Sequence, residues 1–193
     1  VNGYCYPGIN RDVLRQTLPY LTFLSIFSHS VLLDGTLSGI NDQELISIAK
    51  QFRTAPIMVV TNTIEGSGFD SDLARTILTD NAIRSTLINN IVSTARTKGY
   101  SGVDIDFEYI YPSNRTDYNN FLTELKVALE PYNLSLSTAI APKLSATQVG
   151  TLYEAHDYAF HGQVADRVII MTYEWGYKYG APQAVAPLRR VRE

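Results

Sequence analysis

Stretches that favour strands alternate with stretches that favour helices along the whole of this chain. The strand-like runs are short and rich in β-branched and aromatic residues, and we predict six of them, at 2–6, 21–27, 56–61, 102–108, 134–141 and 167–173. Between them, apolar residues recur at helical spacing, most clearly at 41–52, 80–98 and 116–129. We expect Asn41, with Glu44 three residues later, to cap the first of these helices and Gly99 to end the second. This order of elements predicts repeated βα units around a parallel sheet.

The composition narrows the classes of protein that this pattern can belong to. Hydrophobic residues make up 45% of the 193 residues, which supports one sizeable core and rules out a disordered chain. The net charge is only −3, so we expect no nucleic-acid partner. No apolar run approaches the roughly 18 to 20 residues that cross a bilayer, and we expect no membrane span. The one cysteine, Cys5, excludes a disulfide within the chain.

Two α/β architectures fit the alternation, a doubly wound open sheet and a (β/α)8 TIM barrel. The glycine-rich segment 65–69 has neither of the common phosphate-binding spacings, so we interpret it as a loop. Polar residues instead gather where predicted strands end, at Asn62, Glu108 and Tyr173, as they do in barrel enzymes. We therefore predict a single barrel domain over 1–193. A complete barrel has about 250 residues, so we expect this one to be truncated after its sixth strand.

One predicted strand carries acids at every second position, namely Asp104, Asp106 and Glu108. Side chains two residues apart share one face of a strand, so the three carboxyls line one face and apolar residues line the other. Inside a barrel neither face meets bulk water, so the carboxyls crowd together and at least one pKa is expected to rise. Glu108 lies last, at the open end, where a protonated carboxyl can reach a leaving-group oxygen. Carboxylates also bind hard cations, but these form a line rather than a cage, and we expect no metal.

These residues resemble the glycoside hydrolase family 18 chitinases, whose fourth barrel strand carries a DxxDxDxE signature. Asp104, Asp106 and Glu108 match the last three acids, and Ser101 stands in place of the first. On the sixth predicted strand, Met171-Thr172-Tyr173-Glu174 is similar to the family's MxYD segment, with glutamate in place of aspartate. The resemblance implies that the chain is a glycoside hydrolase.

Within that family the chain looks most like the catalytic domain of bacterial spore-cortex lytic enzymes and sporulation-specific glycosylases. The likeness covers nearly the whole chain, and the phrases that carry it are Leu33-Asp34-Gly35-Thr36-Leu37, Val60-Thr61-Asn62, Gly68-Phe69-Asp70-Ser71 and Tyr173-Glu174-Trp175-Gly176. It implies an N-acetylglucosaminidase that cleaves β-1,4 bonds of a polysaccharide substrate, spore-cortex peptidoglycan. It also implies a place outside the cytoplasm, in the spore coat, cortex or cell wall of a spore-forming bacterium. Members of this group often carry LysM repeats before the barrel, which would lie elsewhere in the full-length protein.

The resemblance assigns a role to each residue of the two signatures. Glu108 would protonate the glycosidic oxygen and then act as base for the incoming water. Asp106 would hold the acetamide N–H, Asp104 would share a proton with Asp106, and Tyr173 would bond the acetamide carbonyl. Because the acetamido oxygen of the substrate itself attacks the anomeric carbon, the configuration would be retained. The scheme needs no metal and no organic cofactor.

Six further residues are expected to bind substrate. Asn62 would line the sugar pocket, although a turn residue is the alternative, and Trp175 would stack on a sugar face, although loop packing is the alternative. The remaining four adjoin the signatures or reach the pocket floor: Tyr4, Tyr109, Met171 and Glu174. The three histidines have no metal-ligand spacing, and we interpret them as structural or surface residues: His29, His156 and His161.

Two other functions stay open from the sequence. A chitinase would share the same residues, and substrate profiling on chitin oligomers against cortex glycan separates the two. A catalytically silent glycan-binding module is the other alternative. Silent relatives in this family commonly lose the terminal acid of the signature, whereas Glu108 is present here.

Overall fold

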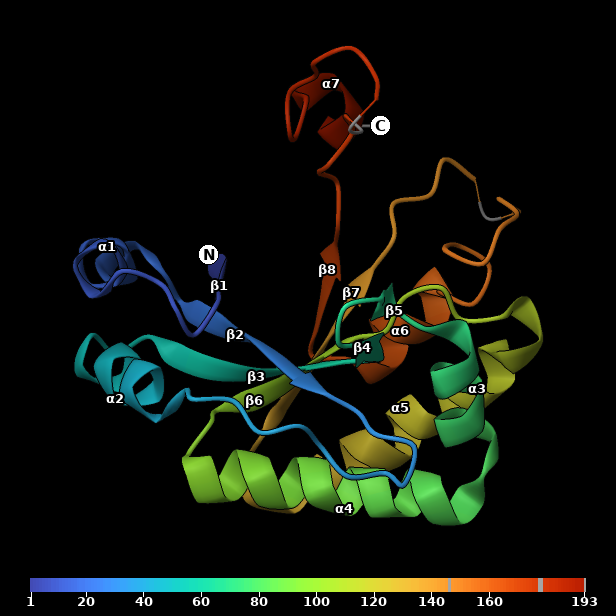
Figure 1. The fold of residues 1–193 in the computed structure, drawn as a ribbon, viewed down its shortest axis with the longest axis horizontal. Helices are drawn as coiled ribbons and strands as arrows, with labels where there is room; N and C mark the ends of the chain where they lie inside the picture. The colour runs from blue at the N-terminus through green and yellow to red at the C-terminus, as the bar shows by residue number, and fades with distance from the viewer. Residues whose placement is uncertain (146, 177–178, 193) are drawn as a thin grey trace.

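A parallel sheet of six strands forms the centre of the molecule (Figure 1). The computed structural model describes residues 1–145, 147–176 and 179–192. The strands lie in the order β1-β2-β3-β6-β7-β8, and each neighbouring pair is parallel. Their bounds are β1 (Asn2–Cys5), β2 (Phe23–Ser30), β3 (Ala55–Thr61), β6 (Gly102–Asp106), β7 (Ser135–Ile140) and β8 (Arg167–Ile170). The sheet is curled. Its curvature brings Tyr4 of β1 within hydrogen-bond distance of Asp104 of β6, although β2 and β3 lie between these strands.

Helices make the connections that parallel strands require. They are α1 (Arg11–Thr17), α2 (Gln43–Gln51), α3 (Ser71–Thr79), α4 (Asn81–Lys98), α5 (Arg115–Leu129), α6 (Tyr158–Val164) and α7 (Leu188–Arg192). Short 3-10 turns occur at η1 (Leu18–Tyr20), η2 (Pro112–Asn114) and η3 (Glu130–Tyr132). In Figure 1, α4 and α5 run beneath the sheet, and α7 lies apart from it. Among the described residues, no helix is both long and apolar enough to cross a membrane.

All six predicted strands and the three predicted helices are present, with differences at their ends. The strand of acids ends at Asp106, two residues earlier than predicted, and the last strand ends at Ile170 rather than at 173. Gly99 ends α4 in the left-handed conformation, as expected, with φ of 82°. The glycine-rich segment is not a plain loop, because its flanks pair as a two-stranded hairpin of β4 (Thr63–Ile64) and β5 (Gly68–Phe69).

The apolar face of β6 packs against the helices and forms the main core. Val103, Ile105 and Phe107 are completely buried, as the alternation predicts. The Phe107 ring stacks on two aromatic rings of α5, with centroids 6.0 Å from Tyr118 and 5.6 Å from Phe121. This packing fixes β6 from one side, so the opposite face carries Asp104 and Asp106 toward the inside of the curled sheet.

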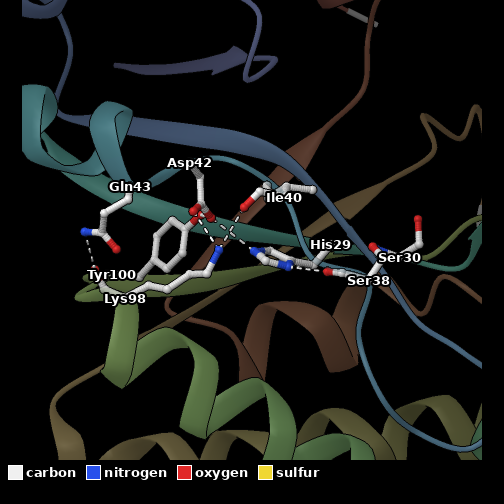
Figure 2. Close-up of polar contacts among 8 residues, drawn as sticks. All are labelled: His29, Ser30, Ser38, Ile40, Asp42, Gln43, Lys98 and Tyr100. Carbon is white, nitrogen blue, oxygen red and sulfur yellow. Dashed lines mark hydrogen bonds and ion pairs between the residues drawn. The ribbon is translucent and has the colours of Figure 1, made fainter.

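A buried polar network fastens the segment after β2 to the end of α4 (Figure 2). Asp42 is 1% exposed and accepts hydrogen bonds from Lys98 Nζ at 2.6 Å and from the Tyr100 hydroxyl. His29 Nε2 lies 3.2 Å from the same carboxylate. Burial alone raises the pKa of Asp42, but the hydrogen bonds from Lys98 and Tyr100 outweigh it and the pKa is lowered. The helix α2 begins after Asp42 without a side-chain cap, so the expected cap by Asn41 is wrong.

Candidate active site

Asp104 is the deepest of the three acids, and two hydroxyl groups close it off. Tyr4 Oη donates to Asp104 Oδ2 at 2.6 Å, and Ser137 Oγ of β7 donates to Asp104 Oδ1 at 2.7 Å. Burial raises the pKa of Asp104, while both hydrogen bonds act to lower it. Burial and the neighbouring Asp104 raise the pKa of Tyr4, which keeps its proton as a donor. Both carboxyl oxygens of Asp104 are therefore already engaged with protein groups.

Asp106 ends β6 one step nearer the open side of the sheet. It is 5% exposed, and its Oδ1 is buried without a hydrogen-bond partner among the described residues. Burial, followed by the charges of Glu108 and Asp104, raises its pKa well above the ordinary value. An unpartnered carboxyl oxygen beside a pocket is a free site for a donor group of a ligand.

Glu108 lies two residues beyond the end of β6, and its side chain is partly exposed. Burial, and then the charge of Glu174, raises its pKa from 4.5 to about 7. A carboxyl with this pKa can give up and take back a proton near neutral pH. The pKa of each of the three acids is raised, in every case chiefly by burial. Only for Asp106 do the charges of the other two acids add to this shift.

A pocket of about 790 Å³ opens over the end of β6. Asp106, Glu108 and Glu174 are its charged lining residues, and no basic side chain lines it among the described residues. Its other walls are largely aromatic, with rings from Tyr4, Tyr6, Phe27, Phe69, Tyr109, Tyr153, Tyr173 and Trp175. Flat apolar rings around a few polar groups suit a neutral ligand that has apolar faces and polar edges.

Most residues that the sequence singles out meet in this pocket. The acids Asp106 and Glu108 are joined there by Tyr4, Tyr109, Met171, Tyr173, Glu174 and Trp175. Burial, and then the charge of Asp106, raises the pKa of Tyr173 to about 12, so its hydroxyl is a proton donor at neutral pH. Trp175 Nε1 donates to the Thr172 carbonyl oxygen at 3.2 Å, which sets the plane of the indole at the pocket wall.

Two of the expected residues lie outside the pocket wall. Asp104 sits below it, sealed by its hydroxyl donors. Asn62 was expected to line the pocket, but the structure places it behind, completely buried. Its Nδ2 donates to the carbonyl oxygens of Glu108 at 2.9 Å and Asp70 at 3.0 Å, and its Oδ1 accepts from the Glu108 N–H at 2.9 Å. Both amide hydrogens of Asn62 are therefore given to backbone carbonyl oxygens, and its buried Oδ1 faces a backbone N–H rather than the pocket.

Sequence reasoning missed several residues that shape the site. Phe27 and Tyr153 line the pocket from β2 and from the segment before α6, and nothing in their local sequence distinguishes them from core aromatics. Phe69 lies in one of the phrases that carry the family resemblance and lines the pocket, but no role was expected for it. His156 is 1% exposed and lies 2.9 Å from the Phe107 carbonyl oxygen, directly behind the acids.

The described residues contain no group of three or more metal-binding side chains that could hold an ion. Asp104 and Asp106 lie in β6 and Glu108 follows its end, and the two oxygens of Asp104 face hydroxyl donors rather than open space. All three histidines are buried and hydrogen-bonded within the protein: His29, His156 and His161. The site is therefore one of carboxyl, hydroxyl and aromatic groups.

Comparison with known proteins shows the family of this chain. The family model for glycosyl hydrolases family 18 matches residues 18–190, and the chain belongs to this family. The cortical fragment-lytic enzyme of Bacillus subtilis (strain 168) is 44% identical over 198 residues, which cover 100% of this chain and 46% of that enzyme. The chain thus spans less than half the length of this relative.

Solved structures agree with this assignment. The spore cortex-lytic enzyme SleL of Bacillus cereus superposes with a TM-score of 0.93 at 39% identity, over 99% of this chain and 45% of that one. A chitinase from Chromobacterium violaceum superposes with a TM-score of 0.89 over 99% of this chain and 61% of that one. At 21% identity, the chitinase shows a shared fold. The predicted barrel architecture and family resemblance are both confirmed.

Proposed function

We propose that the protein is a retaining, substrate-assisted glycosidase that hydrolyses β-1,4 bonds of an N-acetylglucosamine-containing glycan. One observation carries this proposal. The carboxyl of Glu108, with its pKa raised to about 7, opens into the same pocket as Asp106 and Tyr173. A single protein acid suffices in this mechanism because the acetamido group of the substrate supplies the nucleophile.

Each group in the pocket has a step that fits its chemistry. Protonated Glu108 donates its proton to the glycosidic oxygen as the bond to the leaving sugar breaks, and the resulting carboxylate then takes a proton from the attacking water. The unpartnered Oδ1 of Asp106 accepts a hydrogen bond from the acetamide N–H, which holds that group under the anomeric carbon. The Tyr173 hydroxyl donates to the acetamide carbonyl oxygen and fixes its direction of attack.

Asp104 has a supporting part in this scheme. Its two oxygens accept hydrogen bonds from Tyr4 and Ser137, which fix the position of its carboxyl group. From this position behind Asp106, Asp104 can act as a negative charge or share a proton with Asp106. Its charge is one cause of the raised pKa of Asp106. The aromatic rings around the acids then provide stacking surfaces for the sugars, with Trp175 as one of them.

We further propose spore-cortex peptidoglycan as the substrate. The support is the likeness to a cortical fragment-lytic enzyme at 44% identity and to a spore cortex-lytic enzyme at a TM-score of 0.93. This substrate lies outside the cytoplasm, in the cortex or coat of a spore-forming bacterium. LysM repeats elsewhere in the full-length protein would fit the same substrate.

The test compares the full-length wild type with Glu108→Gln on purified cortex fragments. We expect hydrolysis to fall by at least 1,000-fold, or about 4 kcal/mol of activation free energy, with an unchanged circular dichroism spectrum. Glu65→Gln, an exposed acid in the β4–β5 turn, is the matched control and should keep full activity. Retained activity in Glu108→Gln would contradict the assignment of Glu108 as the catalytic acid.

Product analysis separates the alternatives. Rapid NMR of the products should show the β-anomer first if the configuration is retained. Faster cleavage of chitin oligomers than of cortex glycan would replace the proposed substrate with chitin. Binding of glycan without any cleavage by the wild type would identify a silent binding module.

A further inference from the structure

One peptide unit carries Glu108, and buried side chains hold it from two sides. The N–H of Glu108 donates to Asn62 Oδ1 at 2.9 Å, and the carbonyl oxygen of Phe107, in the same peptide plane, lies 2.9 Å from His156 Nε2. Asn62 Nδ2 also donates to the Glu108 carbonyl oxygen at 2.9 Å. Asn62 is completely buried and His156 is 1% exposed, so water does not compete for these bonds.

The contacts of His156 fix its protonation form. Its Nδ1 accepts from the Ala141 N–H at 3.0 Å, so Nδ1 carries no proton. Its Nε2 faces a carbonyl oxygen, which only accepts, so Nε2 carries the proton. The neutral ring protonated on Nε2 is the one form that makes both bonds. Burial lowers the pKa of His156 to about 4, which agrees with a neutral ring at neutral pH.

His156 also connects two walls of the pocket. Ala141, which follows β7, and Glu108, which follows β6, both line the pocket. One imidazole bridges the backbones behind them, and the Tyr158 hydroxyl adds a bond of 2.7 Å to the Ala141 carbonyl oxygen. The groups around the ring are Lys143, whose Nζ donates to the His156 carbonyl oxygen, and the rings of Tyr118 and His161, with centroids at 6.2 and 5.9 Å.

We propose that His156 is a positioning residue for Glu108 and that, with Asn62, it holds the 107–108 peptide so that the carboxyl meets the glycosidic oxygen. This inference rests on the proposed function of the pocket. Glu108 lies beyond the end of β6, where no strand pairing fixes its backbone. The two side chains supply the restraint that the sheet no longer gives. A proton donor displaced by about 1 Å loses about 100-fold in rate.

The test measures kcat, KM and the pH dependence of kcat in the full-length protein. His156→Leu removes both hydrogen bonds at similar volume, and we expect kcat to fall 10- to 100-fold with KM within twofold. The alkaline limb of the profile, set by Glu108, should move to lower pH as the carboxyl turns toward solvent. His156→Gln keeps one donor and one acceptor and should recover most of kcat.

His161→Leu is the matched control. His161 is an equally buried histidine on α6, and its Nδ1 lies 2.9 Å from the Thr138 hydroxyl rather than from the Glu108 backbone. We expect it to lower the melting temperature while leaving kcat and the pH profile unchanged. If His156→Leu does not fold, Asn62→Ala releases the same peptide from the other side and should give the same loss of kcat.

Several results would overturn the proposal. Wild-type kcat and pH profile in folded His156→Leu would do so, as would equal losses of kcat in the two histidine variants. Failure of His156→Gln to exceed His156→Leu would also count against it. These outcomes differ from a failure of the proposed function. Retained activity in Glu108→Gln would reveal that failure, independently of the behaviour of the His156 variants.

Discussion

Glu108 lies in an environment that favours its protonated form. The same environment lowers the stability of the folded protein at alkaline pH, where the side chain is charged. Burial and the charge of Glu174 raise its pKa from 4.5 to about 7. Above pH 7 the folded state must keep an unfavourable carboxylate, which the unfolded chain exposes to water. Replacing Glu108 by glutamine removes this charge and keeps the shape. We therefore expect Glu108→Gln to be more stable than the wild type at pH 8.

The size and pH range of this gain follow from the pKa. The difference between 4.5 and about 7, at about 1.4 kcal/mol per pKa unit, amounts to about 3.4 kcal/mol. Because the side chain is partly exposed, solvent screening reduces this to about 2 kcal/mol. With a raised pKa in the folded state, the favourable protonation is complete below pH 4.5 and is lost as the pH rises through 7. The gain should therefore be absent at pH 4, grow between pH 4.5 and 7, and level off above.

Thermal unfolding followed by circular dichroism at pH 4, 6 and 8 measures this effect. About 2 kcal/mol corresponds to a rise in melting temperature of roughly 4 to 8 °C for a protein of this size. The exposed Glu65→Gln variant should show no such dependence. The reasoning is refuted if Glu108→Gln has the same shift in melting temperature at pH 4 and pH 8, or if it is destabilised at pH 8.

Two further predictions concern the pH profile of the activity and the network behind the sheet. If Glu108 is the general acid, as we propose, it acts in its protonated form, so kcat should fall above about pH 7. Glu174→Gln should move this alkaline limb to lower pH because it removes one cause of the raised pKa of Glu108. If the alkaline limb of the pH–rate profile does not move in Glu174→Gln, then Glu174 does not influence the group that titrates there. Asp42→Ala leaves Lys98 and Tyr100 without their buried acceptor and should cost about 3 kcal/mol in a urea titration. A loss below about 1 kcal/mol would show that the network contributes little.

The strands and helices could be predicted because their signals are local. Apolar residues in Asn81–Lys98 repeat at helical spacing, and β6 alternates acids with apolar residues that fill the core. The ends of the strands and helices were harder to predict from the sequence. Residue 108 leaves the sheet because the buried Asn62 takes its backbone N–H and carbonyl, which no pattern within the strand records. Asp42, likewise, is committed to partners 56 and 58 residues away instead of capping the helix that follows it.

The acids of the site could be predicted from alternation and resemblance, whereas the residues that support them could not. Asn62 has the local appearance of a strand-ending polar residue, and only the fold shows that it points at backbone groups rather than into the pocket. His156 follows no motif, and its contact with the Phe107 carbonyl joins residues 49 positions apart. Such roles depend on which elements become neighbours in the sheet, and a single sequence does not state that order.

The bond between Tyr4 and Asp104 has a consequence for the order in which the molecule folds. Pairing of β1 with β2 closes a loop of 21 residues, whereas the Tyr4–Asp104 bond joins positions 100 residues apart. Closing the longer loop costs about 1.4 kcal/mol more in chain entropy if the residues between are still flexible. During synthesis, the first strand leaves the ribosome long before its carboxylate partner exists. We therefore expect the bond from Tyr4 to Asp104 to form late, after β2, β3 and β6 have assembled between and beside them.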